Sequence, residues 1–148
     1  MARRSVTPDE IALHDATLRW ERLFNEDPLR MCDECYAENC VVTSMANSAT
    51  IEGRARVKQI EVAMLEAYPD RQITVTRRIV SDSTVVIESV WSGTSGSADA
   101  DSSPTRINMC TVLEYADGVI ISDRTYATST SSERAKIVTE IIRRVETS

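Results

Sequence analysis

The spacing of apolar residues changes near residue 70, and this change limits the folds that the chain can adopt. Before it, apolar residues recur every three or four positions, as at Leu13, Ala16 and Trp20, which predicts amphipathic helices. After it, segments rich in Val, Ile and Thr alternate in part with polar residues, which predicts strands. Helices followed by a run of antiparallel strands indicate an α+β fold with the helices on one face of a curved sheet.

Capping and turn residues set the expected boundaries of these elements. Thr7, Pro8 and Glu10 have the pattern of a helix start, because Thr can cap, Pro suits the first helical position and Glu closes a capping box. Pro28 ends the first helix and starts a second, and Pro69 stops a third, since proline cannot continue a helix. The expected helices cover residues 8–25, 28–36, 54–67 and 132–146, and the expected strands cover 40–44, 72–80, 84–94, 105–115 and 119–128.

We expect these elements to form one domain over residues 1–148, with a core at about 8–128 and a C-terminal helix at about 132–146. A chain of 148 residues has an ordinary domain size and can fold without a disulfide or a metal. Asp117 and Gly118 indicate a tight hairpin turn. Residues 95–104 form a polar segment of low complexity, which we interpret as a mobile hairpin tip and not as a domain linker.

The charge and hydropathy of the chain exclude several classes of partner. It has 17 Lys and Arg residues against 23 Asp and Glu, for a net charge of −6, which does not suit a phosphate backbone, so we expect no nucleic acid partner. The sequence has no apolar run as long as the roughly 18 residues that a membrane span needs. Its basic N-terminal residues are not followed by the apolar segment of a secretory signal, so the cytoplasm is the expected location.

The histidine and cysteine content narrows the possible chemistry. His14 is the only histidine, so sites that need two histidines, including most zinc hydrolase sites, are excluded. Cys32, Cys35 and Cys40 lie close together and could suggest a metal or redox site, but there is no second Cys-x-x-Cys to match them, only Cys110. We therefore interpret the cysteines as small core residues. We expect no cofactor and no metal, and keep a metal-linked cysteine site as a third hypothesis.

Six short motifs are spread over residues 11 to about 128. They are Arg19-Trp20 with Leu23-Phe24-Asn25, residues 36–42 (YAENCVV), 51–54 (IEGR), 68–70 (YPD), 91–94 (WSGT) and 117–120 (DGVI). Together with the order of elements, they resemble the SnoaL-like group of polyketide cyclases within the nuclear transport factor 2-like superfamily. The resemblance implies a cone-shaped fold, in which three N-terminal helices pack on a curved, mainly antiparallel sheet around a deep pocket. By analogy it also implies a homodimer.

Strand alternation, with its phase set by the family pattern at the Asp117-Gly118 turn, predicts which side chains face this pocket. On the last strand it puts Ile121, Asp123 and Thr125 inward, although a single bulge would reverse this phase. The result is an aromatic and aliphatic pocket with a few hydroxyls and one carboxylate, which suits a flat, hydrophobic small molecule. The expected lining residues are Trp20, Val42, Ser44, Met64, Ser89, Trp91, Met109, Thr111, Asp123 and Thr125.

Asp123 is the candidate catalytic residue. Burial would raise its pKa and let it exchange a proton near neutral pH. The resemblance implies an acidic residue on this part of the sheet, which closes a polyketide ring by aldol condensation without metal or cofactor. The alternative is that Asp123 pairs with Arg124 or another arginine, or only ends a strand. The group that holds the substrate oxygen is expected to be Ser44, Ser89, Tyr126 or a water.

The chain departs from several branches of the superfamily that it resembles. Residues 93–95 (Gly-Thr-Ser) lack the histidine that the cyclases commonly carry there. The ketosteroid isomerase branch would need an acid near Ser44 and a tyrosine near Trp20, and we expect neither. The positions of the Asp–Arg–Asp set of limonene epoxide hydrolases hold Trp91, Ser89 and Thr125.

Two functions follow as competing expectations. The first is a cofactor-independent, SnoaL-like cyclase, isomerase or hydrolase that acts on a hydrophobic polyketide- or terpenoid-like small molecule, with Asp123 as acid and base. The alternative is a non-catalytic module of the same fold that binds a small molecule or dimerises, which the lost family residues favour. Replacing Asp123 distinguishes the two.

Overall fold

The computed structural model describes residues 4–97, 104–128 and 132–148. Its helices and strands follow the predicted order from helices to strands and back to a helix, which confirms the α+β class. The elements are α1 (Pro8–Glu26), α2 (Pro28–Cys35), β1 (Tyr36–Ser44), β2 (Ala49–Glu52), α3 (Arg54–Ala67), β3 (Gln72–Ser81), β4 (Thr84–Gly93), β5 (Thr105–Ala116), β6 (Val119–Ala127) and α4 (Ser132–Thr147).

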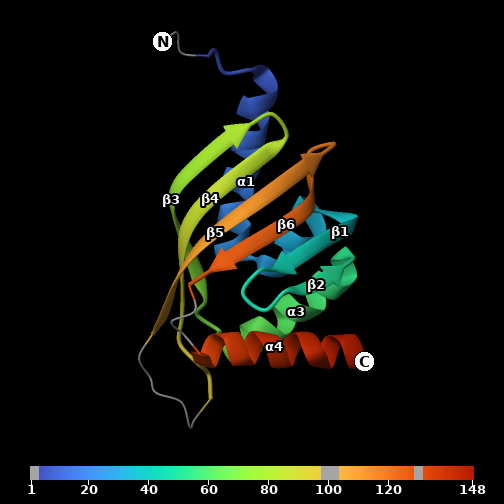
Figure 1. Ribbon diagram of the computed structural model, residues 1–148, viewed down its shortest axis with the longest axis vertical. Helices are drawn as coiled ribbons and strands as arrows, with labels where there is room; N and C mark the ends of the chain where they lie inside the picture. The colour runs from blue at the N-terminus through green and yellow to red at the C-terminus, as the bar shows by residue number, and fades with distance from the viewer. Residues whose placement is uncertain (1–3, 98–103, 129–131) are drawn as a thin grey trace.

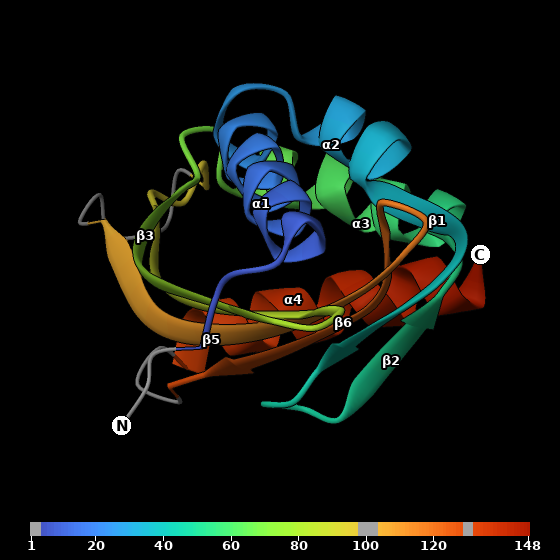
Figure 2. The ribbon, with the colours of Figure 1, turned by 90° about the horizontal axis from the view of Figure 1, so that it is seen from above.

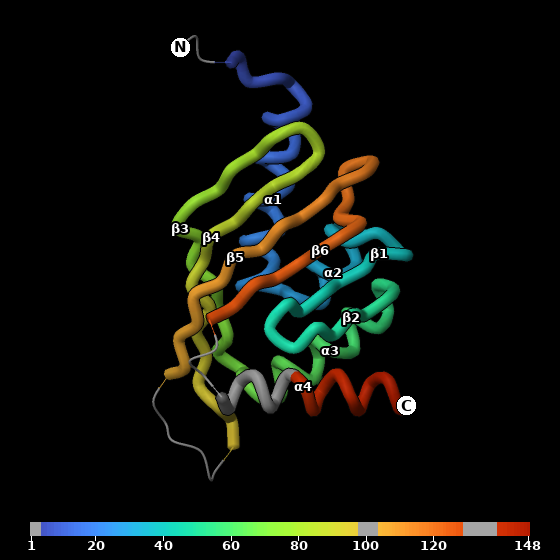
Figure 3. The backbone as a smooth tube through the Cα atoms, viewed as in Figure 1, coloured from blue at the N-terminus to red at the C-terminus, as the bar shows by residue number. Residues whose placement is uncertain are grey.

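The strands form one curved sheet in the order β2-β1-β6-β5-β4-β3 (Figure 1). Neighbouring strands are antiparallel except β1 and β6, which are parallel. Figure 2 shows α1, α2 and α3 together on the concave side of the sheet. The helix α4 contacts α3 and β2 and crosses the lower end of the molecule. α1 begins at the opposite, upper end (Figure 3).

Local sequence explains where the helices begin. The Thr7 hydroxyl accepts the backbone N–H of Glu10, and the Glu10 carboxylate accepts the backbone N–H of Thr7, which is the predicted capping box. The Asp27 side chain accepts the backbone N–H of Arg30 at the start of α2. Gly53 precedes α3 with a φ of +92°, a conformation that favours glycine.

The first strand is longer than predicted, and a second one follows it. β1 begins at Tyr36, directly after α2, and not at Cys40. No strand was predicted over residues 49–52, but they pair with the end of β1 as β2. The prediction missed β2 because only Ile51 among its four residues is buried, so it has no alternating apolar pattern. Of the expected hairpin tip at residues 95–104, residues 98–103 lie outside the described residues.

The predicted phase of the sheet is confirmed on β4 and β5 and only in part on β6. Trp91 and Thr111 are buried, as expected. The pairing of β6 with β5 shifts by one residue at Ile121, so Ile120 is buried and Ile121 is 40% exposed. The prediction that Ile121 faces inward was therefore wrong. Because the extra residue falls before Asp123, that carboxylate still faces inward.

Two of the family motifs pack against each other in the core. The ring of Tyr68 meets the ring of Trp91 edge to face, with the centroids 5.0 Å apart. A Cβ atom at Gly93 would lie 2.7 Å from the Trp91 ring and 3.2 Å from Tyr68, which is too close for a side chain. The motifs at residues 68–70 and 91–94 are thus parts of a single aromatic contact that needs a glycine.

Candidate active site

A cavity of about 250 Å³ lies between the concave face of the sheet and the helices. Its wall is mainly apolar and includes Met31 of α2, Val57 of α3 and Ile142 of α4. The residues predicted to line the pocket that do line this cavity are Trp20, Val42, Ser44, Met64, Trp91, Met109, Thr111, Asp123 and Thr125.

Ser89 and Tyr126, two of the alternatives expected to hold the substrate oxygen, do not line the cavity. Ser89 is buried opposite Met109 and Val75 on the neighbouring strands. Tyr126 is 46% exposed. It follows Thr125 along β6, and successive residues of a strand point to opposite faces, so Tyr126 lies on the outer face of the sheet.

Asp123 lies at the centre of a chain of hydrogen bonds that crosses the cavity wall. The Tyr36 hydroxyl donates to Oδ2 of Asp123 at 2.7 Å, and the Trp20 indole N–H donates to that hydroxyl at 3.2 Å. The Thr125 hydroxyl donates to Oδ1 of Asp123 at 3.1 Å, and the Thr111 hydroxyl lies 3.1 Å from that of Thr125. Each carboxylate oxygen therefore has a donor from the protein.

This environment changes the acidity of both buried groups. Asp123 is 5% exposed, and burial raises the pKa of its carboxyl above the ordinary value of 3.8. The hydrogen bonds from Tyr36 and Thr125 oppose that rise in pKa without cancelling it. Burial, and then the nearby Asp123, raise the pKa of Tyr36 well above its ordinary value. Tyr36 therefore stays protonated and serves as a donor, and Asp123 is the group that can exchange a proton.

The alternative reading of Asp123, as the partner of Arg124, does not match its contacts. The Arg124 guanidinium pairs with Glu114 at 3.2 Å on the neighbouring strand. Among the described residues, Asp123 forms no ion pair with an arginine. Its side chain lies between Val42 of β1 and Leu113 of β5, which are its partners in the sheet. Apolar neighbours and neutral donors thus hold the carboxyl group.

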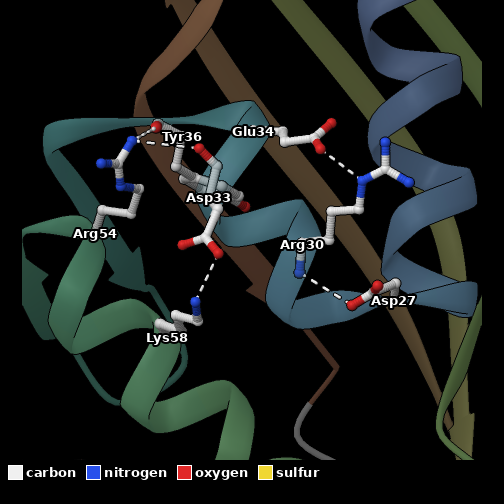
Figure 4. Close-up of polar contacts among 7 residues, drawn as sticks. All are labelled: Asp27, Arg30, Asp33, Glu34, Tyr36, Arg54 and Lys58. Carbon is white, nitrogen blue, oxygen red and sulfur yellow. Dashed lines mark hydrogen bonds and ion pairs between the residues drawn. The ribbon is translucent and has the colours of Figure 1, made fainter.

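The junction between α2 and β1 positions Tyr36 so that its hydroxyl reaches Asp123. Figure 4 shows Arg54 reaching from α3 to the end of α2, where its guanidinium donates to the backbone carbonyls of Asp33 and Tyr36, both at 3.3 Å. The Lys58 ammonium also binds the Asp33 carboxylate, at 2.6 Å. Positive charge at the C-terminus of a helix is favourable. These contacts fix the point where the helix becomes a strand, and so the position of Tyr36.

Sequence reasoning missed Tyr36 as a site residue. We expected no tyrosine near Trp20, and this was wrong, because the Trp20 indole donates directly to Tyr36. The two residues lie 16 positions apart, and Tyr36 lies 87 positions from Asp123. Tyr36 could have been found if the strand had been predicted from residue 36 onward, because that strand runs beside β6. The prediction began the strand at Cys40 and so left Tyr36 out of it.

A buried ion pair forms another part of the cavity wall. The Arg71 guanidinium, just before β3, pairs with the Glu61 carboxylate of α3, and both side chains line the cavity. The Cζ atom of Arg71 lies 4.0 Å from the centre of the Phe24 ring. Neither member of this pair was predicted as a site residue.

The remaining candidates lie outside the site. Cys32, Cys35 and Cys40 are buried free thiols, and burial raises the pKa of all three above the ordinary value, which disfavours the reactive thiolate. Within the described ranges, no group of three or more His, Cys, Asp or Glu side chains is arranged to hold a metal ion. His14 lies on the exposed side of α1. No helix in the described part of the chain is long and apolar enough to cross a membrane.

Solved structures with the same fold extend over most of this chain. A phenazine biosynthesis-related protein from Pseudomonas aeruginosa is 15% identical with a TM-score of 0.75, covering 91% of this chain and 88% of that one. A SnoaL-like polyketide cyclase, so named, from Jannaschia sp. is 17% identical with a TM-score of 0.72, covering 95% and 98%. An LEH-like epoxide hydrolase from Mycobacterium tuberculosis is 15% identical with a TM-score of 0.71, covering 96% and 95%. At these identities the likeness shows the fold alone.

The family itself is shown by the sequence. The SnoaL-like domain model matches residues 17–122, which is more than half of the 148 residues. No match was found among curated proteins. With its nuclear transport factor 2-like fold, the chain belongs to the SnoaL-like domain family.

Proposed function

We propose that the protein is a cofactor-independent enzyme that performs acid–base chemistry on a hydrophobic, polyketide- or terpenoid-like small molecule. The observation that supports this most is Asp123, a buried carboxyl group on the wall of a mainly apolar cavity. Its pKa is raised by burial, and a pKa closer to neutral lets one carboxyl group both accept and return a proton. Relatives in fold are named cyclase, isomerase and epoxide hydrolase.

The proposed reaction needs only the groups on the cavity wall. The Asp123 carboxylate removes a proton from a carbon next to a carbonyl group, and the electron pair moves onto the carbonyl oxygen to form an enolate. In an isomerisation, Asp123 returns the proton to another carbon. In a cyclisation, the enolate carbon attacks a second carbonyl of the same molecule, and the proton goes to the new alkoxide. The Ser44 and Thr111 hydroxyls and the apolar residues Trp20, Met64, Trp91 and Met109 would hold the substrate.

The cavity volume limits the size of that substrate. An apolar protein cavity of about 150 Å³ can hold benzene, and the cavity here has about 250 Å³. A molecule of about two fused rings fits this volume in the unliganded shape. A four-ring polyketide would require part of the wall to move.

The test is to compare the wild type with Asp123→Asn, using a β,γ-unsaturated bicyclic ketone, an alicyclic epoxide and an aromatic poly-β-ketone. The variant keeps the shape of the side chain and removes its ability to exchange a proton. We expect the turnover of an accepted substrate to fall by about 10²–10⁴-fold, the usual contribution of a general acid or base. Asp117→Asn, in the exposed turn before β6, is the matched control. Equal turnover by wild type and Asp123→Asn would rule out the proposed role.

A second candidate function is a module that binds a small molecule and does no chemistry. The donor on each oxygen of Asp123 favours it, since a carboxyl group held by the protein can be structural. If wild type and Asp123→Asn bind the same ketone equally and neither converts any of the three probes, this second function is correct.

The expected homodimer and the cytoplasmic location are part of the proposal. Ile121 and Tyr126 on the outer face of the sheet, and Ile79 at its edge strand, are exposed, and apolar side chains of this kind would be covered in a dimer. Buried free thiols fit a reducing compartment. Sedimentation velocity tests the first point, and cell fractionation tests the second.

A further inference from the structure

Arg71 is a buried cation on the wall of a mainly apolar cavity. Its side chain is 2% exposed. Three contacts hold it in place: the ion pair with Glu61, the face of Phe24 and its own backbone N–H, which donates to the Tyr68 carbonyl at 3.1 Å. Burying a charged group is costly, so a buried arginine at a binding site calls for an explanation.

The hydrogen bonds of Arg71 are incomplete. Its Nε atom is buried and has no acceptor among the described residues. Nearly all buried donors in proteins have a partner, so an exception calls for an explanation, and a group that binds there is one such explanation. Arg78 provides a comparison, since its Nε also lacks an acceptor and it pairs with Glu21. Arg78 does not line the cavity, so of these two arginines only Arg71 has a side chain that borders a space that a ligand can enter.

We propose that Arg71 is the recognition site for a neutral carbonyl oxygen of the ligand. This rests on the proposed function only in taking the cavity as the binding site. The oxygen accepts from the guanidinium N–H groups that the Glu61 carboxylate leaves free. A neutral acceptor fits better than a carboxylate because Glu61 already balances the charge of Arg71, and a second anion beside it would be repelled.

The placement of Arg71 also gives the ligand an orientation. Phe24, which lies under Arg71, and Trp20, which donates to Tyr36, are one turn apart on α1, or about 6 Å along the helix axis. Their rings are in contact, with centroids 5.6 Å apart. A ligand that touches both groups therefore carries its recognised carbonyl at one end and its reacting carbon, near Asp123, at the other.

The test measures binding and not turnover. The probes are α-tetralone and tetralin, two-ring molecules that differ by one carbonyl oxygen, with a tetralin carboxylate as the anionic probe. Isothermal titration calorimetry gives the ratio of their dissociation constants. For the wild type we expect the ketone to bind about tenfold or more tightly than the hydrocarbon, as a hydrogen bond to a charged donor provides. In Arg71→Met/Glu61→Gln we expect that preference to disappear while tetralin binding changes little.

The controls separate a ligand contact from a structural role. Arg78→Met/Glu21→Gln removes the other ion pair with an open Nε and should keep the preference for the ketone. Arg71→Lys keeps the charge without the planar guanidinium, and it replaces the double variant if circular dichroism shows that the double variant does not fold. We expect Arg71→Lys to have a smaller preference for the ketone over tetralin than the wild type has. Equal binding of ketone and hydrocarbon by the wild type, an unchanged preference in the Arg71 variants, tighter binding of the carboxylate, or binding of none of the probes would each overturn the inference.

These results are distinguishable from those that test the proposed function. Asp123→Asn should keep the preference for the ketone, because Asp123 does not contact the Arg71 guanidinium in any described hydrogen bond or ion pair. If Asp123→Asn keeps full turnover while the preference disappears in the Arg71 variants, the proposed function fails and this inference holds. The reverse pattern rejects this inference alone.

Discussion

The two polar groups of the cavity differ in how completely the protein satisfies them. At Asp123, donors from two strands converge, Tyr36 of β1 and Thr125 of β6, so that both carboxylate oxygens are bonded before any ligand arrives. At Arg71, one carboxylate and one aromatic face hold a group with five N–H donors, and one of its nitrogens has no partner. Asp123 is thus held rigidly, as proton transfer requires, and Arg71 keeps an unused donor, as recognition of a ligand requires.

The largest effect on stability is expected from removing the donor at the Asp123 end. Tyr36→Phe leaves Oδ2 of Asp123 without its donor and the Trp20 indole without its acceptor, both in a buried site. We expect the free energy of unfolding to fall by about 1–3 kcal/mol, the cost of an unpaired buried polar group. Urea unfolding followed by tryptophan fluorescence measures it.

The matched control for that change is Tyr126→Phe, which removes a hydroxyl from the exposed face of the same sheet. Its effect should stay within about 0.5 kcal/mol. If the two variants lose the same stability, the hydrogen bonds at Asp123 contribute nothing specific, and the contrast between the two ends of the cavity fails.

Stability should also depend on pH through Asp123. Burial raises the pKa of this carboxyl in the folded protein, so the folded state binds the proton more tightly than the unfolded chain. This stabilises the fold fully below the unfolded pKa of about 3.8, and the contribution is lost as pH rises through the raised value. The unfolding free energy of the wild type minus that of Asp123→Asn should therefore decrease as pH rises from about 3.8 through the raised pKa. The decrease is at most about 1.4 kcal/mol per pH unit. A difference that is constant from pH 3 to pH 8, or that grows with pH, contradicts this assignment.

The smallest effect is expected at the Arg71 end. Phe24→Leu removes the ring under the guanidinium and should lower the unfolding free energy by about 0.5–1 kcal/mol beyond the change in packing. A double-mutant cycle with Arg71→Met isolates that part. A coupling of zero would mean that the ring only fills space, and that Glu61 alone positions Arg71.

Most of the fold was predictable because its signals are local. The capping box at Thr7 and the turn at Asp117 and Gly118 both act within a few residues, and the helix over residues 54–67 was placed to the residue. These three features need no knowledge of the rest of the chain. Alternation put Asp123 and Thr125 inward only with its phase taken from the family pattern, and both residues line the cavity.

The rest of the site depends on contacts between distant segments. Tyr36 reaches Asp123 because β1 pairs in parallel with β6. Arg71 is held at the cavity by contacts with two separate helices, through Phe24 of α1 and Glu61 of α3. Neither residue stands out in the sequence, since one follows a short helix and the other a turn. Tyr126 was misplaced for a different reason, because the alternation that puts Thr125 inward already puts the next residue outward, and the prediction did not apply it to Tyr126.

The extra residue at Ile121 has a consequence for how the family varies. Tyr115 pairs with Ile120 and Glu114 pairs with Ser122, so Ile121 has no partner of its own on β5. Deleting Ile121 would leave an unbroken ladder in which Asp123 still lies opposite Leu113 and faces the cavity. A relative can therefore lack this residue and keep its carboxyl group in place, and the two chains then align correctly only with a gap at Ile121.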